Sequence, residues 1–177
     1  MKFKIKKAQP KPLKKTTLNR FLRKRMIIYV IPNVFFNFII AYASFNELGY
    51  THFFACTQSL ARLTLPMAIF LPVVLTIDIM KRVTDAAGQE AIEFKVDDQL
   101  NLKKLMTKLS ILHGLITGSL VLLSLLSAQY ILSEFYKLDA TAMALLVGVL
   151  AGLLSILFTY IPILILKRYL YKTLPAN

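Results

Sequence analysis

The sequence predicts an all-α, polytopic membrane protein with four transmembrane helices, arranged as two hairpins with both termini in the cytoplasm. Of its 177 residues, 56% are hydrophobic and only 18% are charged, and the charged residues lie in separate segments. The uncharged stretches between them are residues 26–46, 63–77, 109–133 and 140–166. A helix needs about 20 apolar residues to cross roughly 30 Å of hydrocarbon. Three of the four stretches meet that length outright.

The second stretch is shorter than the other three. It reaches about 20 residues if Asp78 lies at one membrane interface and the long side chain of Arg62 extends to the other. These two residues are about 24 Å apart along a helix, so they cannot pair with each other. We therefore expect them at opposite interfaces.

Lysine and arginine residues predict the orientation. Residues 1–25 hold eleven of the 22 Lys and Arg, the second connection holds six, and the C-terminal tail holds three. The two remaining connections hold only Arg62 and Lys137. Because cytoplasmic loops accumulate Lys and Arg, we expect both termini in the cytoplasm. Ala41 and Ala43 also fit a signal-peptide cleavage site, but the apolar region before them is too long, which favours a retained span.

The same plan divides the chain into five segments. They are a basic cytoplasmic tail (1–25), a first transmembrane hairpin (26–82), a cytoplasmic connection (83–108), a second transmembrane hairpin (109–168) and a C-terminal cytoplasmic tail (169–177). In the connection, Ile92, Val96 and Leu100 recur every four residues, as in the apolar stripe of an amphipathic helix. We expect this segment to lie on the inner leaflet or to cap the bundle.

Basic residues next to the spans are expected to contact the headgroups of a bilayer that contains anionic lipid. Each contributes about 1 kcal/mol when it lies close to the surface. A membrane role accounts for the basic tail, so no nucleic-acid partner is expected. The predicted headgroup contacts are Arg23, Lys24, Arg25, Lys81, Arg82, Lys167 and Arg168.

Small residues recur every four positions in the last two spans, and so share one helical face. The third span has Ser110, Gly114 and Gly118, and the fourth has Ala140, Ala144, Gly148 and Gly152. Small side chains allow two backbones to approach closely. We expect the two faces to pack, most simply against each other within the second hairpin. The alternative is that one of them forms an interface in a homo-oligomer or larger membrane complex.

Asn33 and Asn37 lie on one face of the first span. An amide exposed to lipid would lose hydrogen bonds at several kcal/mol each, so both must face protein or water. They could form interhelical hydrogen bonds or line a substrate path, and the sequence leaves both alternatives open.

The sequence offers no set of residues for catalysis. No acidic residue lies at the centre of a span, and His52, Cys56 and His113 lack the spacing of metal ligands. No nucleophile with a base and no glycine-rich phosphate loop is present. We therefore expect no enzyme, no cofactor and no metal.

The first hairpin has a Leu-Gly turn followed by Phe, and its second helix has an A-x-x-x-x-P-x-A-x-x-x-P pattern and ends in basic residues. The residues of this pattern are Leu48, Gly49, Phe53, Ala61, Pro66, Ala68, Pro72 and Arg82. In this pattern the hairpin resembles small bacterial hairpin membrane proteins of unknown function, although the tryptophans usual in their second helix are missing. This resemblance implies a bacterial inner-membrane location and no activity. The topology is also similar to that of GtrA-like four-span proteins, which assist the flipping of lipid-linked sugars, but the ending expected of their second helix is absent.

These observations favour a non-enzymatic accessory or scaffold subunit that acts through helix–helix packing. The alternative is a small transporter or flippase component, with Asn33 and Asn37 along its path.

Overall fold

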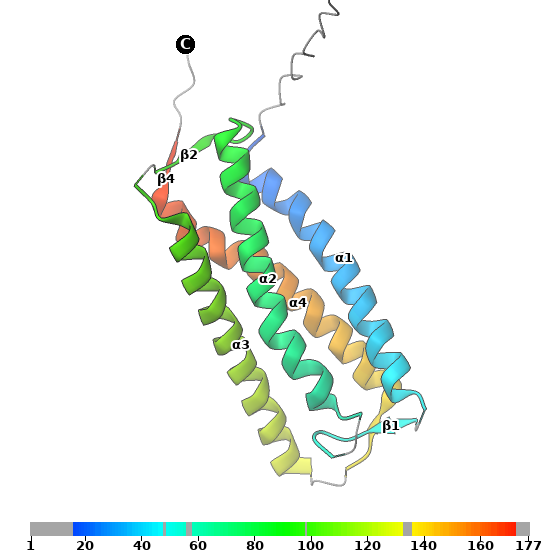
Figure 1. The fold of residues 1–177 in the computed structure, drawn as a ribbon. Helices are drawn as coiled ribbons and strands as arrows, with labels where there is room; N and C mark the ends of the chain where they lie inside the picture. Colours follow the sequence, from blue (N-terminus) through cyan, green and yellow to red (C-terminus); the bar gives the residue numbers. More distant parts are fainter. Residues whose placement is uncertain (1–15, 48, 56–57, 98, 133–135, 173–177) are drawn as a thin grey trace, which may run out of the picture.

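Four long helices make up most of the computed structural model, which describes residues 16–47, 49–55, 58–97, 99–132 and 136–172. They are α1 (Leu18–Phe45), α2 (Leu60–Gly88), α3 (Leu102–Leu132) and α4 (Ala140–Leu166), as Figure 1 shows. All four are long and apolar enough to cross a membrane, which confirms the prediction of a multi-pass helical protein. Residues 1–15 of the predicted tail, Leu48, Cys56 and residues 173–177 lie outside the described residues.

Helices α1, α2 and α3 extend into charged segments beyond the uncharged stretches that predicted them, whereas α4 coincides with its stretch. Helix α1 begins at Leu18, inside the predicted basic tail, because the Thr17 hydroxyl oxygen accepts a hydrogen bond from the Arg20 backbone N–H at 3.4 Å. Helix α4 begins in the same way, with the Asp139 carboxylate accepting from the Ala142 N–H at 2.7 Å. Helix α2 continues past Arg82 to Gly88. Lys and Arg are good helix formers, so charge ends the apolar stretch without ending the helix.

A short two-stranded antiparallel sheet lies at each end of the bundle. Strand β2 (Phe94–Val96) pairs antiparallel with β4 (Leu170–Lys172), which follows the 3₁₀ helix η1 (Lys167–Tyr169). Thr16, just before α1, forms a bridge with Ile92, so both ends of the described chain lie at one end of the bundle, called here the terminal end (Figure 1). At the opposite end, the loop end, β1 (Tyr50–Thr51) pairs antiparallel with β3 (Leu138–Asp139).

The amphipathic helix expected around Ile92, Val96 and Leu100 is not formed, because β2 occupies this segment. Helix α2 ends at Gly88, two residues before Glu90, whose φ of 54° turns the chain. The Ala91 N–H then donates to the Ala86 carbonyl at 2.9 Å. Ile92, Val96 and Leu100 still pack against the apolar core at the terminal end. The segment therefore caps the bundle as expected, but as a strand instead of a helix. Pairing with β4, far away in the sequence, replaces the hydrogen bonds of a helix.

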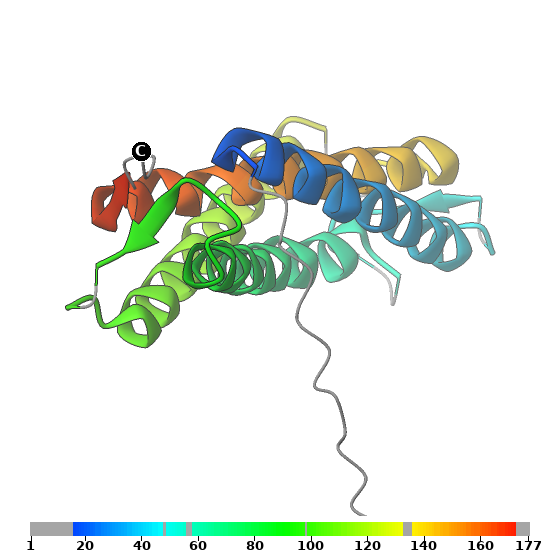
Figure 2. The same ribbon diagram turned by 90° about the horizontal axis from the view of Figure 1, so that it is seen from above.

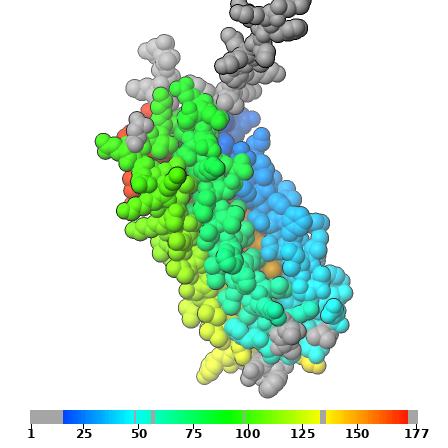
Figure 3. Space-filling model, in the orientation of Figure 1, coloured from blue at the N-terminus to red at the C-terminus, as the bar shows by residue number. Residues whose placement is uncertain are grey.

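The two predicted hairpins are not the packing units of the bundle. Helix α1 packs most extensively along α4, and α2 packs against both α3 and α4. Figure 2 shows α1 beside α4, and in Figure 3 atoms of α4 are visible between α1 and α2. The small-residue faces described below lie in the α2–α3 and α1–α4 contacts, where they let these helices approach more closely than the two helices of each predicted hairpin do.

Apolar cores lie at both ends of the bundle. The terminal-end core includes Leu18, Met80, Val83 and Leu166, and the loop-end core includes Phe45. A smaller cluster of Leu75, Leu154 and Phe158 lies in between. The outer surfaces of the helices are apolar as well, which is what contact with lipid requires.

Candidate functional site

The glycines of α3 form a close contact with α2. A Cβ atom added at Gly114 would lie 2.8 Å from the Ile69 carbonyl oxygen and 2.7 Å from Val73 Cγ2. At Gly118 it would lie 2.5 Å from Ile69 Cγ1. Ser110, one turn before Gly114, is buried and donates its hydroxyl to the Thr107 carbonyl at 3.0 Å. This face, Ser110–Gly114–Gly118, brings the two helix backbones together, and we call it the α2–α3 seam.

The glycines of α4 form the corresponding contact with α1. A Cβ atom at Gly148 would lie 3.1 Å from Phe38 Cβ and 3.2 Å from the Val34 carbonyl oxygen, and one at Gly152 would lie 2.7 Å from Val34 Cγ2. Ala144, one turn nearer the loop end, is completely buried. We call this face, Ala144–Gly148–Gly152, the α1–α4 seam.

The prediction that these two small-residue faces pack against each other is therefore wrong. Gly114 and Gly118 contact α2, whereas Gly148 and Gly152 contact α1. A pattern of small residues shows which face of a helix can be approached closely, but it carries no information on which helix approaches. Both faces are also occupied within the chain, which leaves neither free for the alternative of an oligomer interface.

Asn33 and Asn37 lie on the α4-facing side of α1 and both are half-buried. The Asn33 amide N–H donates to Ser155 Oγ on α4 at 2.9 Å, and the Ser155 hydroxyl donates to the Ala151 carbonyl at 2.8 Å. The Asn37 amide instead donates to the Asn33 carbonyl of its own helix at 2.8 Å. The structure therefore uses Asn33 to join two helices and Asn37 to satisfy the backbone of one.

We expect replacement by leucine to lower the free energy of unfolding more at Asn33 than at Asn37. Asn33→Leu removes an interhelical hydrogen bond, and such bonds contribute about 0.6 kcal/mol on average and about 1.7 kcal/mol at most in a membrane protein. Asn37→Leu removes only a bond within α1, so its unfolding free energy should stay within about 0.5 kcal/mol of the native value. Unfolding of the purified chain by SDS in mixed micelles measures both. Equal losses at the two positions would contradict this assignment.

A second polar cluster joins α1 to α2 near the terminal end, and the sequence analysis missed it. The Tyr29 hydroxyl donates to Asp78 Oδ2 at 2.5 Å, and Arg82 Nε donates to the same oxygen at 2.6 Å. Arg82, predicted as a lipid contact, is thus paired within the chain. The spacing of Asp78 and Arg82, four residues apart on a helix, could have indicated that pair. Nothing in the sequence pointed to Tyr29.

A third polar contact joins α2 to α3. Thr76 Oγ1 and His113 Nδ1 are 2.9 Å apart and form a buried hydrogen bond. The His113 ring also packs against Phe158 of α4, with ring centroids 5.0 Å apart. His113 therefore connects three helices.

The predicted headgroup contacts lie at the terminal end. Arg23, Lys24, Lys81, Lys167 and Arg168 have exposed side chains there. Arg25 is half-buried, with its guanidinium carbon 5.2 Å from the centre of the Phe21 ring. These positions suit contact with lipid headgroups at one membrane surface.

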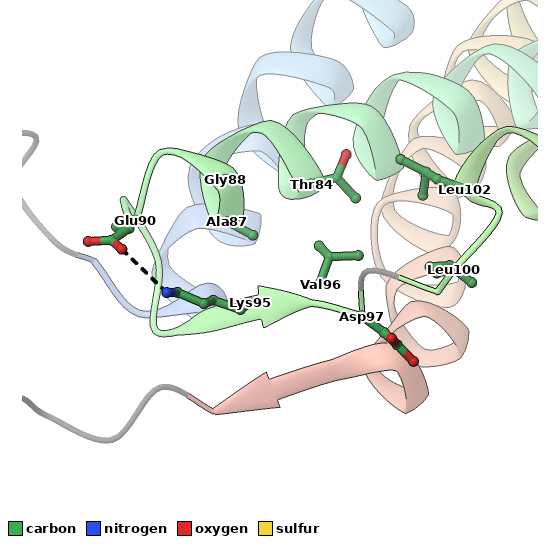
Figure 4. Close-up of a pocket in the computed structure, with 9 residues that line it drawn as sticks. All are labelled: Thr84, Ala87, Gly88, Glu90, Lys95, Val96, Asp97, Leu100 and Leu102. Atoms are coloured by element: carbon green, nitrogen blue, oxygen red, sulfur yellow. Dashed lines mark ion pairs between the residues drawn. The ribbon is translucent and has the colours of Figure 1, made fainter.

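A pocket of about 420 Å³, lined by both polar and apolar side chains, lies in the terminal-end cap (Figure 4). Glu90 and Lys95 form an ion pair across its edge at 3.5 Å, and both side chains are more than half exposed. An exposed pair of this kind contributes at most about 1 kcal/mol. Among the described residues, no group of three or more His, Cys, Asp or Glu side chains could hold a metal ion.

Comparison with protein-family models, curated proteins and solved structures finds no match to this chain. The resemblances to bacterial hairpin proteins and to GtrA-like proteins stay predictions.

Proposed function

We propose that the chain is a non-enzymatic protein of the bacterial inner membrane that serves as an accessory or scaffold subunit through helix–helix packing. The observation that carries this proposal is the use of the polar side chains inside the bundle. Asn33, Asp78 and His113 each bond to a neighbouring helix. Groups engaged in this way hold the helices together, which supports a packing role.

The outer face of α1 offers the surface for a partner in a larger membrane complex. In the apolar part of α1 only 6% of the residues are buried, against 39–50% in the apolar parts of the other three helices. Phe35 and Phe36 lie on this face and are 57% and 59% exposed. Aromatic side chains are the typical anchors of protein interfaces, so these two are the residues on which a partner helix would pack.

Native mass spectrometry of the chain, purified in mild detergent after cross-linking in its own membrane, tests this function. A complex of fixed stoichiometry should appear, and the double variant Phe35→Ala/Phe36→Ala should lose it. Leu123→Ala, on the equally exposed face of α3, is the matched control and should keep it. A chain that is monomeric throughout, or a complex insensitive to the α1 variant, would contradict the proposal.

The competing function, a small transporter or flippase component, would require a polar path along Asn33 and Asn37. The hydrogen bond from Asn33 to Ser155 and the bond of Asn37 to its own helix favour the packing role. Transport would gain support if Asn37→Leu removed an uptake phenotype while leaving the stability of the chain unchanged.

Both termini are proposed to be cytoplasmic, because nearly all of the basic residues that the structure describes lie at the terminal end, whereas the loop end carries Arg62 and Lys137. We expect a reporter fused to the C-terminus to be active only if it is a cytoplasmic reporter. A fusion placed in the α1–α2 connection should give the opposite result. A C-terminal fusion that reports the periplasm would refute the orientation.

A further inference from the structure

A groove runs between α3 and α4, where the two consecutive helices leave space on the outer surface of the bundle. Its volume is about 510 Å³. The buried side chains of His113, Thr117 and Phe158 form its floor. Exposed leucine and isoleucine side chains such as Ile116 and Leu120 form its rim, at 50% and 60% exposure. The groove is therefore apolar and opens toward the hydrocarbon of the bilayer.

The dimensions of the groove fit one extended hydrocarbon chain. Its α3 wall runs from Leu109 to Ser124, a length of about 22 Å along the helix, and half of the hydrocarbon core is about 15 Å thick. A helix 10 Å in diameter has a cross-section of about 80 Å², so a partner helix could insert only side chains into a groove of this volume, whereas one hydrocarbon chain can lie along it.

Basic side chains stand at the terminal-end mouth of this groove. Lys108 and Lys104 precede the lining residue Leu112 by one and two helical turns, so they continue the same face of α3. On the other wall, Arg168 follows the lining residue Ile165 by three residues. All three side chains are exposed, and none forms an ion pair with a residue that the structure describes. The mouth is thus complementary in charge to a phosphate group.

His113 supplies a polar group between the cationic mouth and the apolar groove. It lies five residues beyond Lys108, about 7.5 Å deeper along α3. When the Thr76 hydroxyl donates to Nδ1, the proton of the neutral ring lies on Nε2, which forms no hydrogen bond to the described residues. Nε2 can then donate to a carbonyl oxygen at that depth, which is where the ester of a glycerophospholipid follows its phosphate.

We propose that this groove is a binding site for one anionic glycerophospholipid. One acyl chain lies between α3 and α4, the ester carbonyl lies near His113, and the phosphate lies among Lys104, Lys108 and Arg168. The site is separate from the seams and from the outer face of α1, so it does not rest on the proposed accessory function.

The test uses the full-length chain, stripped of lipid and titrated in detergent with phosphatidylglycerol, with native mass spectrometry to count bound lipids. One phosphatidylglycerol should bind with defined affinity, and phosphatidylcholine should bind at least about tenfold more weakly, because an anionic lipid gains from each basic residue near its headgroup. Glycerol 3-phosphate, which carries a phosphate group and no acyl chain, should not displace the lipid.

Two variants and a control separate the acyl groove from the headgroup site. Lys108→Gln/Arg168→Gln should weaken phosphatidylglycerol by about tenfold and phosphatidylcholine by less, because the choline cation of phosphatidylcholine offsets the charge of its phosphate. Leu120→Trp, which fills the groove from its exposed rim, should weaken both lipids. Arg20→Gln, an exposed terminal-end position on α1, should weaken neither. Equal affinity for the two lipids, equal loss in the control, or a groove-dependent dimer in place of a lipid adduct would overturn the proposal.

Discussion

Gly114→Ala is expected to lower the free energy of unfolding by about 1–3 kcal/mol, the usual effect of forcing extra volume into a packed contact. The added methyl group would lie 2.8 Å from the Ile69 carbonyl oxygen, a backbone atom that cannot rotate away. Helices α2 and α3 would have to separate along the whole seam. Reversible unfolding of the purified chain by SDS in mixed micelles gives the value directly.

Two other glycines serve as controls for this variant. Gly88, at the end of α2, has no atom within 4 Å of an added Cβ, so Gly88→Ala should be neutral or slightly stabilising. The loss of unfolding free energy for Gly118→Ala should lie between the losses for Gly114→Ala and Gly88→Ala. The closest neighbour of Gly118 is the Ile69 side chain, which can adopt another rotamer. If Gly114→Ala and Gly88→Ala unfolded alike, the close backbone contact at the α2–α3 seam would be disproved.

Asp78→Leu is expected to cost about 1–2 kcal/mol of stability. It removes the acceptor for both the Tyr29 hydroxyl and the Arg82 guanidinium, and an unpaired buried donor costs about 1–3 kcal/mol. The side chains of Arg82 and Asp78 are 43% and 34% exposed, so water replaces part of the lost interaction and lowers the expected effect.

A double-mutant cycle isolates the contribution of Tyr29. Tyr29→Phe alone should destabilise the chain, and combined with Asp78→Leu it should add little, giving a coupling energy of at least about 0.5 kcal/mol. Tyr130→Phe, at a side chain that is 91% exposed, is the control and should be additive with Asp78→Leu. Additive effects for Tyr29 as well would show that the bond joining α1 to α2 contributes nothing.

The four helices could be predicted because hydrophobic length is a local property of the chain. The uncharged stretch from 140 to 166, for example, coincides with α4. The start of α1 was less predictable, since Thr17 caps a helix whose first turns are basic. A charge boundary marks where the apolar stretch ends, whereas a helix ends where its backbone groups find other partners.

The helix pairings could not be predicted in the same way, because they depend on contacts between residues distant in the sequence. Gly148 and Gly152 were recognised as a close-packing face, yet their partner Val34 lies on the first helix. Short connections made hairpin neighbours the simplest assumption, but two consecutive antiparallel helices need not be the ones that pack. The bond from Tyr29 to Asp78 and the pairing of β2 with β4 escaped prediction for the same reason.

Disulfide formation between α1 and α4 tests most directly whether small residues join helices from different predicted hairpins. In a chain with Cys56→Ser, the pair Val34→Cys/Gly152→Cys should oxidise readily in native membranes, because a Cβ at position 152 lies 2.7 Å from the Val34 side chain. The pair Gly118→Cys/Gly148→Cys, which would meet if α3 and α4 packed through their glycine faces, should stay reduced. Cross-linking of the second pair in preference to the first would contradict the account.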